Sequence, residues 1–202
     1  MIKVLLFDLN NVICSEGFRR GVEAMEHFYN LPKKYVYDIV HDNSFWPDFT
    51  VGKISESEYL KRCEQQAQGK FEVEKYLKFV HDNFIIYEDV VGLIKELKNN
   101  FKIGVVSNSA TAWFDFALKK AGLDQFVDIR GASGSLHIRK ENPKFYEEVL
   151  KMAGVNGEEV IHIDDRADRL EVTHQLGIKT IIFDGKKDSV SDFKNNLNKL
   201  IK

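Results

Sequence analysis

Cysteine and proline are scarce in this sequence: two of its 202 residues are cysteines and three are prolines. Cys14 and Cys63 form no metal-ligand spacing, and so few thiols are typical of a reducing compartment. We therefore expect a cytoplasmic protein. The few prolines, and the lack of any low-complexity tract, argue against long disordered linkers.

Long apolar runs and an excess of one charge are also missing. No segment is long enough to span a bilayer, and the apolar run at the N-terminus is too short for a signal peptide. Lysine and arginine number 29 against 31 aspartates and glutamates, with no dense basic block. Nothing therefore recommends a nucleic acid or a membrane as a partner, and we expect a monomer or a homodimer.

The first ten residues carry the strongest pattern. Ile2 to Phe7 is apolar apart from Lys3, which is typical of a strand buried on both faces. The run ends at Asp8, and in open α/β sheets ligands bind at the carboxyl ends of the strands. Asp8 is thus a candidate site residue, although Asp also commonly begins turns.

A helical insert follows this strand. Helices are predicted over Gly17–Phe28, over Pro32–Val40, from Ser55 onward, and over Phe71–Asn83. No convincing strand interrupts them, and the segment is far longer than an ordinary crossover. We therefore predict a helical cap subdomain at residues 15–84, inserted into a core formed by residues 1–14 and 85–202.

Strands and helices alternate in the rest of the chain. The predicted strands are Phe101–Val106, Phe126–Ile129, Glu158–Ile163 and Ile178–Phe183, and the predicted helices are Val90–Leu97, Thr111–Ala121, Pro143–Met152, Arg166–Leu176 and Ser189–Ile201. Such alternation predicts an α/β fold: a doubly wound, Rossmann-like parallel sheet with helices on both faces.

Polar residues follow several of these strands. Asp8, Ser107 with Asn108, and Asp164 with Asp165 come at strand ends, and Lys140 precedes a helix. In a parallel sheet these groups meet at one edge. An Asp there can act as a nucleophile, carboxylates can hold Mg²⁺, and Ser and Lys can hold phosphate oxygens.

Each group alone also has an ordinary structural explanation. Ser107–Ser109 and Asp164–Asp165 can cap the helices that follow them, and Lys140 alone would be a solvated surface residue. Their order at successive strand ends is what favours a phosphoryl-transfer site.

The same residues resemble the phosphatases of the haloacid dehalogenase superfamily. Four motifs match in order: Phe7-Asp8-Leu9-Asn10-Asn11-Val12-Ile13, Val105-Val106-Ser107-Asn108, Arg139-Lys140-Glu141-Asn142-Pro143, and Ile163-Asp164-Asp165 with Leu176-Gly177-Ile178. The insert resembles the type 1 cap of that family, with Gly52-Lys53-Ile54-Ser55 as a familiar feature. The first motif resembles a branch that includes a bacterial glucose-1-phosphate phosphatase and the phosphatase domain of soluble epoxide hydrolase.

The resemblance implies specific roles. Asp8 would be the nucleophile and a Mg²⁺ ligand, with the backbone carbonyl of Asn10 and the carboxylate of Asp165 as further ligands. Ser107 and Lys140 would bind the transferring phosphoryl group, and Asn108 would face the substrate. The implied protein is a Mg²⁺-dependent phosphomonoester hydrolase that forms an aspartyl-phosphate. Its substrate would be a small phosphorylated metabolite, with sugar phosphates favoured.

Three positions depart from the family pattern. Asn10 stands where most such phosphatases carry an acid–base Asp, Glu141 where a Pro usually follows the lysine, and Arg169, beside Asp168, where a second acid often stands. Two alternatives stay open. One is a 2-haloacid dehalogenase-like hydrolase, which shares the Asp nucleophile but needs no metal, and the Asp164-Asp165 pair argues against it. The other is a catalytically weak relative that binds a phosphorylated ligand, which Asn10 keeps open. Candidate substrate contacts in the cap are Arg19, Arg20, His41, Phe45 and Trp46.

Overall fold

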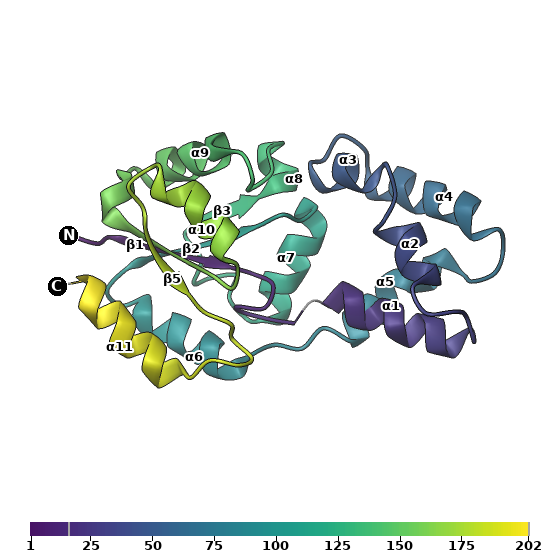
Figure 1. Ribbon diagram of the computed structural model, residues 1–202, viewed down its shortest axis with the longest axis horizontal. Coiled ribbons are helices and arrows are strands. Elements are labelled where there is room, and N and C mark those ends of the chain that lie inside the picture. The colour runs from purple at the N-terminus through teal and green to yellow at the C-terminus, as the bar shows by residue number, and fades with distance from the viewer. Residues whose placement is uncertain (16, 202) are drawn as a thin grey trace.

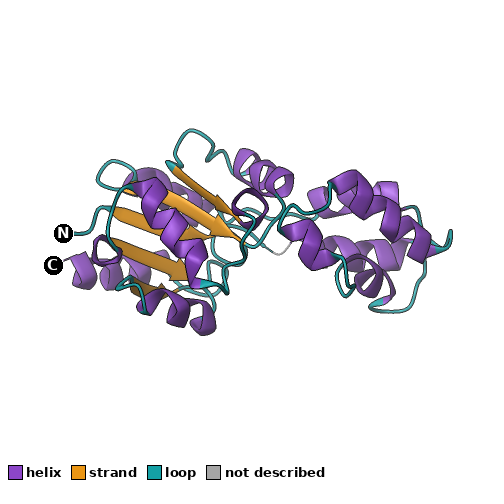
Figure 2. Ribbon diagram, turned by 90° about the horizontal axis from the view of Figure 1, so that it is seen from above, coloured by secondary structure: helices purple, strands orange, loops and turns teal. Residues whose placement is uncertain are grey.

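A parallel sheet of five strands forms the centre of the computed structural model, which describes residues 1–15 and 17–201. The strands are β1 (Val4–Asp8), β2 (Lys102–Ser107), β3 (Ile129–Ala132), β4 (Val160–Asp164) and β5 (Lys179–Ile182), in the spatial order β3-β2-β1-β4-β5. Figure 2 shows the strands side by side. This order places the end of β1 between the ends of β2 and β4.

The side chains of β1 alternate between the two faces of the sheet, and all five of its residues are buried. Leu5 and Phe7 belong to one hydrophobic cluster, while Val4 and Leu6 belong to the other. Gly104 of β2 makes room for this packing, because a Cβ atom there would lie 2.3 Å from Leu6 Cδ2. A strand buried on both faces gives Asp8 at its end a fixed position.

Helices cover both faces of the sheet. On the Leu5 face, α6 (Glu88–Leu97), α7 (Thr111–Lys120) and α11 (Val190–Ile201) pack into one cluster. On the other face, α9 (Pro143–Ala153) supplies most of the helical residues, and α10 (Ala167–His174) packs beside it. Figure 1 shows these two layers, and the doubly wound α/β fold is confirmed.

Five further helices and a 3₁₀ turn stand between β1 and α6 in the chain. They are α1 (Gly17–Phe28), α2 (Tyr35–Val40), α3 (Trp46–Thr50), α4 (Glu56–Ala67), the turn η1 (Val73–Lys75) and α5 (Tyr76–Asp82). We call α1 to α5 the helical insert. It has a hydrophobic cluster of its own and lies at the opposite end of the molecule from both chain termini (Figures 1 and 2).

Some element boundaries differ from the sequence prediction. The third strand was predicted at residues 126–129, but β3 spans Ile129–Ala132. Phe126 and Val127 lie instead in a turn, where their N–H groups donate to Leu123 O. The second helix of the insert begins at Tyr35 rather than Pro32, after Lys34 in the left-handed region (φ 71°). The short helices α3 and α8 (Ser133–Leu136) were not predicted, and neither spans more than five residues.

No helix within residues 1–15 and 17–201 combines the length and the apolar character that crossing a membrane requires.

Candidate active site

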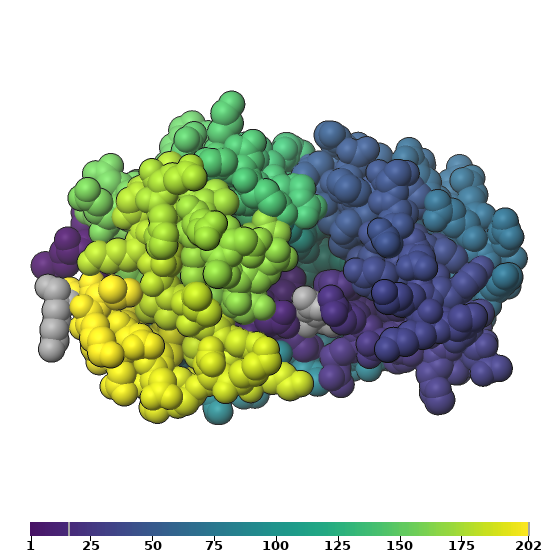
Figure 3. All heavy atoms as spheres, viewed as in Figure 1, coloured from purple at the N-terminus to yellow at the C-terminus, as the bar shows by residue number. Residues whose placement is uncertain are grey.

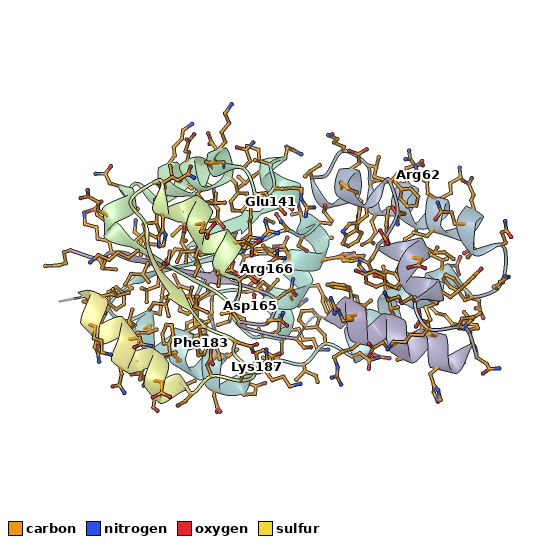
Figure 4. The ribbon with its side chains drawn as sticks, in the orientation of Figure 1. Arg62, Glu141, Asp165, Arg166, Phe183 and Lys187 are labelled. Carbon is orange, nitrogen blue, oxygen red and sulfur yellow. The ribbon has the colours of Figure 1, made fainter. Side chains whose placement is uncertain are left out.

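The carboxyl ends of β1, β2 and β4 meet at the edge of the sheet that faces the helical insert. A cavity of about 120 Å³ opens there, lined by Asp8, Asn10, Asn11, Ser107, Asn108, Lys140, Asp164, Asp165, Arg166 and Arg169. Every residue predicted from the sequence to bind the metal or the phosphoryl group therefore lines a single cavity, together with Asn108. Figure 4 shows Glu141, Asp165 and Arg166 on the core side of the junction, and in Figure 3 a recess lies where the insert meets the core.

Lys140 lies at the centre of the site. Asn142 caps α9 by accepting from the N–H of Lys144, and Pro143 occupies the first helical turn, so the chain turns sharply before the helix. Lys140 Nζ lies 2.6 Å from Asp8 Oδ1 and 2.7 Å from Asp164 Oδ2, and its side chain is only 4% exposed. Burial lowers the pKa of Lys140, but the neighbouring groups, with the charge of Asp8 the largest of them, together outweigh this and raise the pKa well above its ordinary value. The lysine is thus a buried cation.

Three carboxylates surround this one cation. Asp8, Asp164 and Asp165 each place an oxygen within 4.8 Å of the others. Burial raises the pKa of Asp8 to about 7, and the nearby charge of Asp164 adds to the increase while Lys140 opposes it. Burial also raises the pKa of Asp165, although Asn11 Nδ2 donates to Asp165 Oδ2 at 3.1 Å. These three carboxylates outnumber the single ammonium of Lys140, because Arg166 and Arg169 of the same cavity pair with Asp168 and Glu141. Such a cluster suits a hard divalent cation.

The partners of each carboxylate indicate which of them are suited to a cation. Asp164 already accepts from Lys140 through Oδ2 and from the Arg166 N–H through Oδ1, at 3.0 Å. Asp165 is half-buried and lines the cavity, and Asp8 lines the same cavity from the end of β1. Asp8 and Asp165 therefore fit Mg²⁺ best, with Asp164 serving to hold Lys140.

Ser107 presents a buried hydroxyl to the same cavity. Its side chain is 1% exposed, and within the described residues its Oγ has no hydrogen-bond partner. A buried hydroxyl without a partner costs about 1–3 kcal/mol in stability, so such groups are rare away from functional sites. Ser107 can donate to an anion bound beside Lys140.

Asn108 connects the β2 end to the lysine loop. Its Oδ1 accepts from the Lys140 N–H at 2.8 Å, and its Nδ2 donates to both oxygens of Glu141, at 3.1 and 3.0 Å. Arg169 Nη2 lies 2.7 Å from Glu141 Oε1, and Arg139 Nη2 lies 3.3 Å from it. Burial raises the pKa of Glu141, but the hydrogen bonds from Arg169 and Asn108 outweigh it and lower the pKa to about 2. Glu141 is therefore an anion that ties three neighbouring groups together.

A second, aromatic cavity begins beside the first. It measures about 60 Å³ and shares Asn10 and Asn108 with the catalytic cavity. Its aromatic lining comes from the insert side (Phe18, Trp46, His81 and Phe84) and from α7 (Trp113 and Phe116). We call this cavity the aromatic slot.

The expected cap contacts are placed very differently. Trp46 lines the aromatic slot. His41 and Phe45 are buried within the insert, and Arg19 and Arg20 are exposed. Trp113 and Phe116 were not predicted as substrate contacts, because helical periodicity assigns them to α7 without indicating that they face the insert.

Comparisons with known proteins relate the chain to one family of hydrolases. The sequence matches the haloacid dehalogenase-like hydrolase family over residues 2–177. It is 24% identical to flavin mononucleotide hydrolase 1 of Arabidopsis thaliana, over 96% of this chain and 77% of that protein. It is also 24% identical to the pyrophosphatase PpaX of Bacillus mycoides, over 89% of this chain and 82% of that protein.

Solved structures share the fold. A HAD family enzyme of Bacteroides thetaiotaomicron, solved with magnesium and inorganic phosphate, superposes with a TM-score of 0.82 at 18% identity, covering 96% of this chain and all of that chain. The L-2-haloacid dehalogenase of Xanthobacter autotrophicus superposes with a TM-score of 0.68 at 16% identity, covering 98% and 83% of the two chains.

Proposed function

Because the chain belongs to the haloacid dehalogenase-like hydrolases, we propose that it is a Mg²⁺-dependent phosphomonoester hydrolase with Asp8 as its nucleophile and the helical insert as its cap. Its substrate is a small phosphorylated metabolite. One observation carries the proposal: the ammonium of Lys140 lies between Asp8 and Asp164, beside the unpartnered hydroxyl of Ser107. The relatives named for hydrolysis of flavin mononucleotide and of pyrophosphate support a phosphatase-type activity.

The reaction proceeds in two displacements. A carboxylate oxygen of Asp8 bonds to phosphorus as the ester P–O bond breaks, and the leaving oxygen takes a proton from solvent. Water then attacks the phosphorus of the aspartyl-phosphate, which releases inorganic phosphate and restores Asp8. Throughout, Ser107 donates to a phosphoryl oxygen, and the positive charge of Lys140 offsets the negative charge that gathers there.

The metal and the dependence on good leaving groups are parts of the same proposal. Asp8, the backbone carbonyl of Asn10 and the carboxylate of Asp165 would hold Mg²⁺, which supplies positive charge that reduces repulsion between the phosphoryl oxygens and the carboxylates. The acidic cluster argues against a metal-free dehalogenase. Asn10 cannot transfer a proton, so the enzyme depends on good leaving groups.

The decisive experiment compares Asp8→Asn with Asp192→Asn, an exposed carboxylate on α11. Hydrolysis of p-nitrophenyl phosphate with Mg²⁺ should disappear in Asp8→Asn and persist in Asp192→Asn, with both variants folded by circular dichroism. Chelation should abolish the activity and Mg²⁺ should restore it. More than a few per cent of activity left in Asp8→Asn would exclude the nucleophile, and full activity after chelation would favour the dehalogenase alternative. Sugar phosphates and nucleotides form the first panel of natural substrates.

A further inference from the structure

The aromatic slot indicates the class of substrate, on the premise that Asp8 acts as proposed above. We propose that the leaving group of the phosphate ester carries a flat aromatic ring, which binds between Trp46 of the insert and Trp113 and Phe116 of α7.

The position of the slot ties it to the leaving group. Asn10 and Asn108 line both the catalytic cavity and the slot, so the two cavities adjoin at these two residues. Lys140 and Asp164 line the catalytic cavity but not the slot. A phosphoryl group bound beside Lys140 would therefore direct its ester oxygen, and whatever that oxygen carries, past the two asparagines into the slot.

The rings of the slot are held in place by their neighbours. The Trp46 and Trp113 ring centroids lie 5.8 Å apart, and Trp113 Nε1 donates to Glu56 Oε2 of α4. The ring of His81 stacks on Phe116, with centroids 3.6 Å apart and an interplanar angle of 16°. These contacts join the insert to α7, so a flat ring that enters between the two would replace one aromatic partner with another.

The polar groups of the slot do not suit a polyhydroxylated leaving group. Asn10 and Asn108 lie at the shared end, and the Asn108 amide is already engaged by Glu141 and the Lys140 N–H. Ser109 Oγ donates to Ala110 O. Apart from His81, the rest of the lining is apolar or aromatic, so most hydroxyls of a polyhydroxylated group would lose their hydration without gaining a partner, whereas an aromatic ring has few polar groups to satisfy.

The size of the slot means that the ring must displace part of its lining. A volume of about 60 Å³ can hold water, but an engineered cavity that binds benzene measures about 150 Å³. The ring can enter only if the insert side moves away from α7. Both tryptophans of the chain line the slot, so their fluorescence reports this movement directly.

A binding experiment tests the ring without any chemistry. The Mg²⁺-loaded protein is titrated with phenylphosphonate, cyclohexylphosphonate and methylphosphonate while tryptophan emission is recorded. We expect phenylphosphonate to change the emission and to bind about tenfold more tightly than the other two, because only its ring is flat and aromatic. Equal affinities for the phenyl and cyclohexyl compounds would overturn the proposal.

A kinetic experiment separates this proposal from the proposed function. Benzyl phosphate and cyclohexylmethyl phosphate both release primary alcohols, so their leaving oxygens need similar protonation. We expect a higher kcat/KM for benzyl phosphate. The ratio of the two kcat/KM values should fall about tenfold in Phe116→Leu and stay unchanged in Phe28→Leu, whose ring is 64% exposed on the insert.

The outcomes are distinct. Asp8-dependent hydrolysis of both esters at equal rates would overturn the aromatic leaving group and leave the phosphatase standing. If p-nitrophenyl phosphate is not hydrolysed in an Asp8-dependent reaction, the proposed function fails and the leaving-group assignment fails with it.

Discussion

The stability of the fold should depend strongly on Lys140 when no metal is bound. Lys140→Met keeps most of the buried stem but removes the ammonium that lies 2.6 Å from Asp8 and 2.7 Å from Asp164. At an effective dielectric constant of about 20, each contact represents roughly 6 kcal/mol of gross Coulomb attraction. Desolvation of the lysine and both carboxylates offsets most of this attraction. Removing one partner of a buried ion pair typically costs about 3–5 kcal/mol, which is the loss we expect here.

The assay is urea unfolding followed by circular dichroism in excess chelator at neutral pH. The control is Lys144→Met, an exposed lysine on α9, which should unfold within about 0.5 kcal/mol of the wild type. Mg²⁺ should then stabilise Lys140→Met more than the wild type, because the bound cation is no longer repelled by the Lys140 ammonium beside Asp8.

Two results would refute this reasoning. If Lys140→Met in chelator lies within about 1 kcal/mol of the wild type, the lysine is not the buried counter-ion of the carboxylates. If Mg²⁺ stabilises both proteins equally, the bound cation and the Lys140 ammonium do not interact with the same carboxylate, Asp8.

Three further perturbations test other parts of the molecule. Asn10→Asp should speed hydrolysis of alkyl phosphates by about 10²–10⁴-fold and of aryl phosphates less; equal effects on both would show that residue 10 does not transfer protons. Burial, helped by the charge of Arg19, lowers the pKa of His41 to about 3, so the unfolded chain takes up its proton first. Burial lowers the pKa of His162 to about 3 as well, so each of these two histidines should contribute about 1.4 kcal/mol per pH unit to the loss of stability below about pH 6.5. His41→Gln should remove its share of that slope relative to exposed His27→Gln, whereas parallel slopes would contradict it. Ser107→Ala should weaken inorganic phosphate binding, measured by calorimetry, without lowering the unfolding free energy; unchanged binding would remove Ser107 from the site.

The sequence predicted the sheet and its polar edge because these follow from short-range patterns. An apolar run that ends in Asp8 indicates a buried strand from local sequence alone, without knowledge of the rest of the fold. Strands alternating with helices then bring the residues after β1, β2 and β4 to one edge. β3 was misplaced because Gly131 weakens the strand pattern; in the sheet, a Cβ atom there would lie 2.9 Å from Val106 Cγ1.

The aromatic slot could not be predicted in the same way. Trp46 and Trp113 are far apart in the chain. Trp46 begins the short helix α3, which was not predicted, and the periodicity of α7 indicates only that Trp113 lies on or near a buried side. Which neighbour covers that side depends on where the insert rests on the core. That placement is set by contacts such as Ser133 Oγ to Thr50 O at 2.7 Å and Arg139 Nη1 to Thr50 Oγ1 at 2.9 Å. Neither contact leaves a periodic signal in the sequence.

Two of the departures from the family pattern are explained by each other. Glu141 replaces the usual Pro and Arg169 replaces a frequent acid, and in the fold Arg169 Nη2 lies 2.7 Å from Glu141 Oε1. Arg169 lines the catalytic cavity with Asp164 and Asp165, and its pairing with Glu141 offsets a positive charge that would otherwise compete with a metal there. The same carboxylate holds Asn108, whose Oδ1 fixes the backbone of Lys140. Glu141→Gln should therefore free Arg169 to approach the carboxylates and weaken Mg²⁺ binding, even though Glu141 does not line the catalytic cavity.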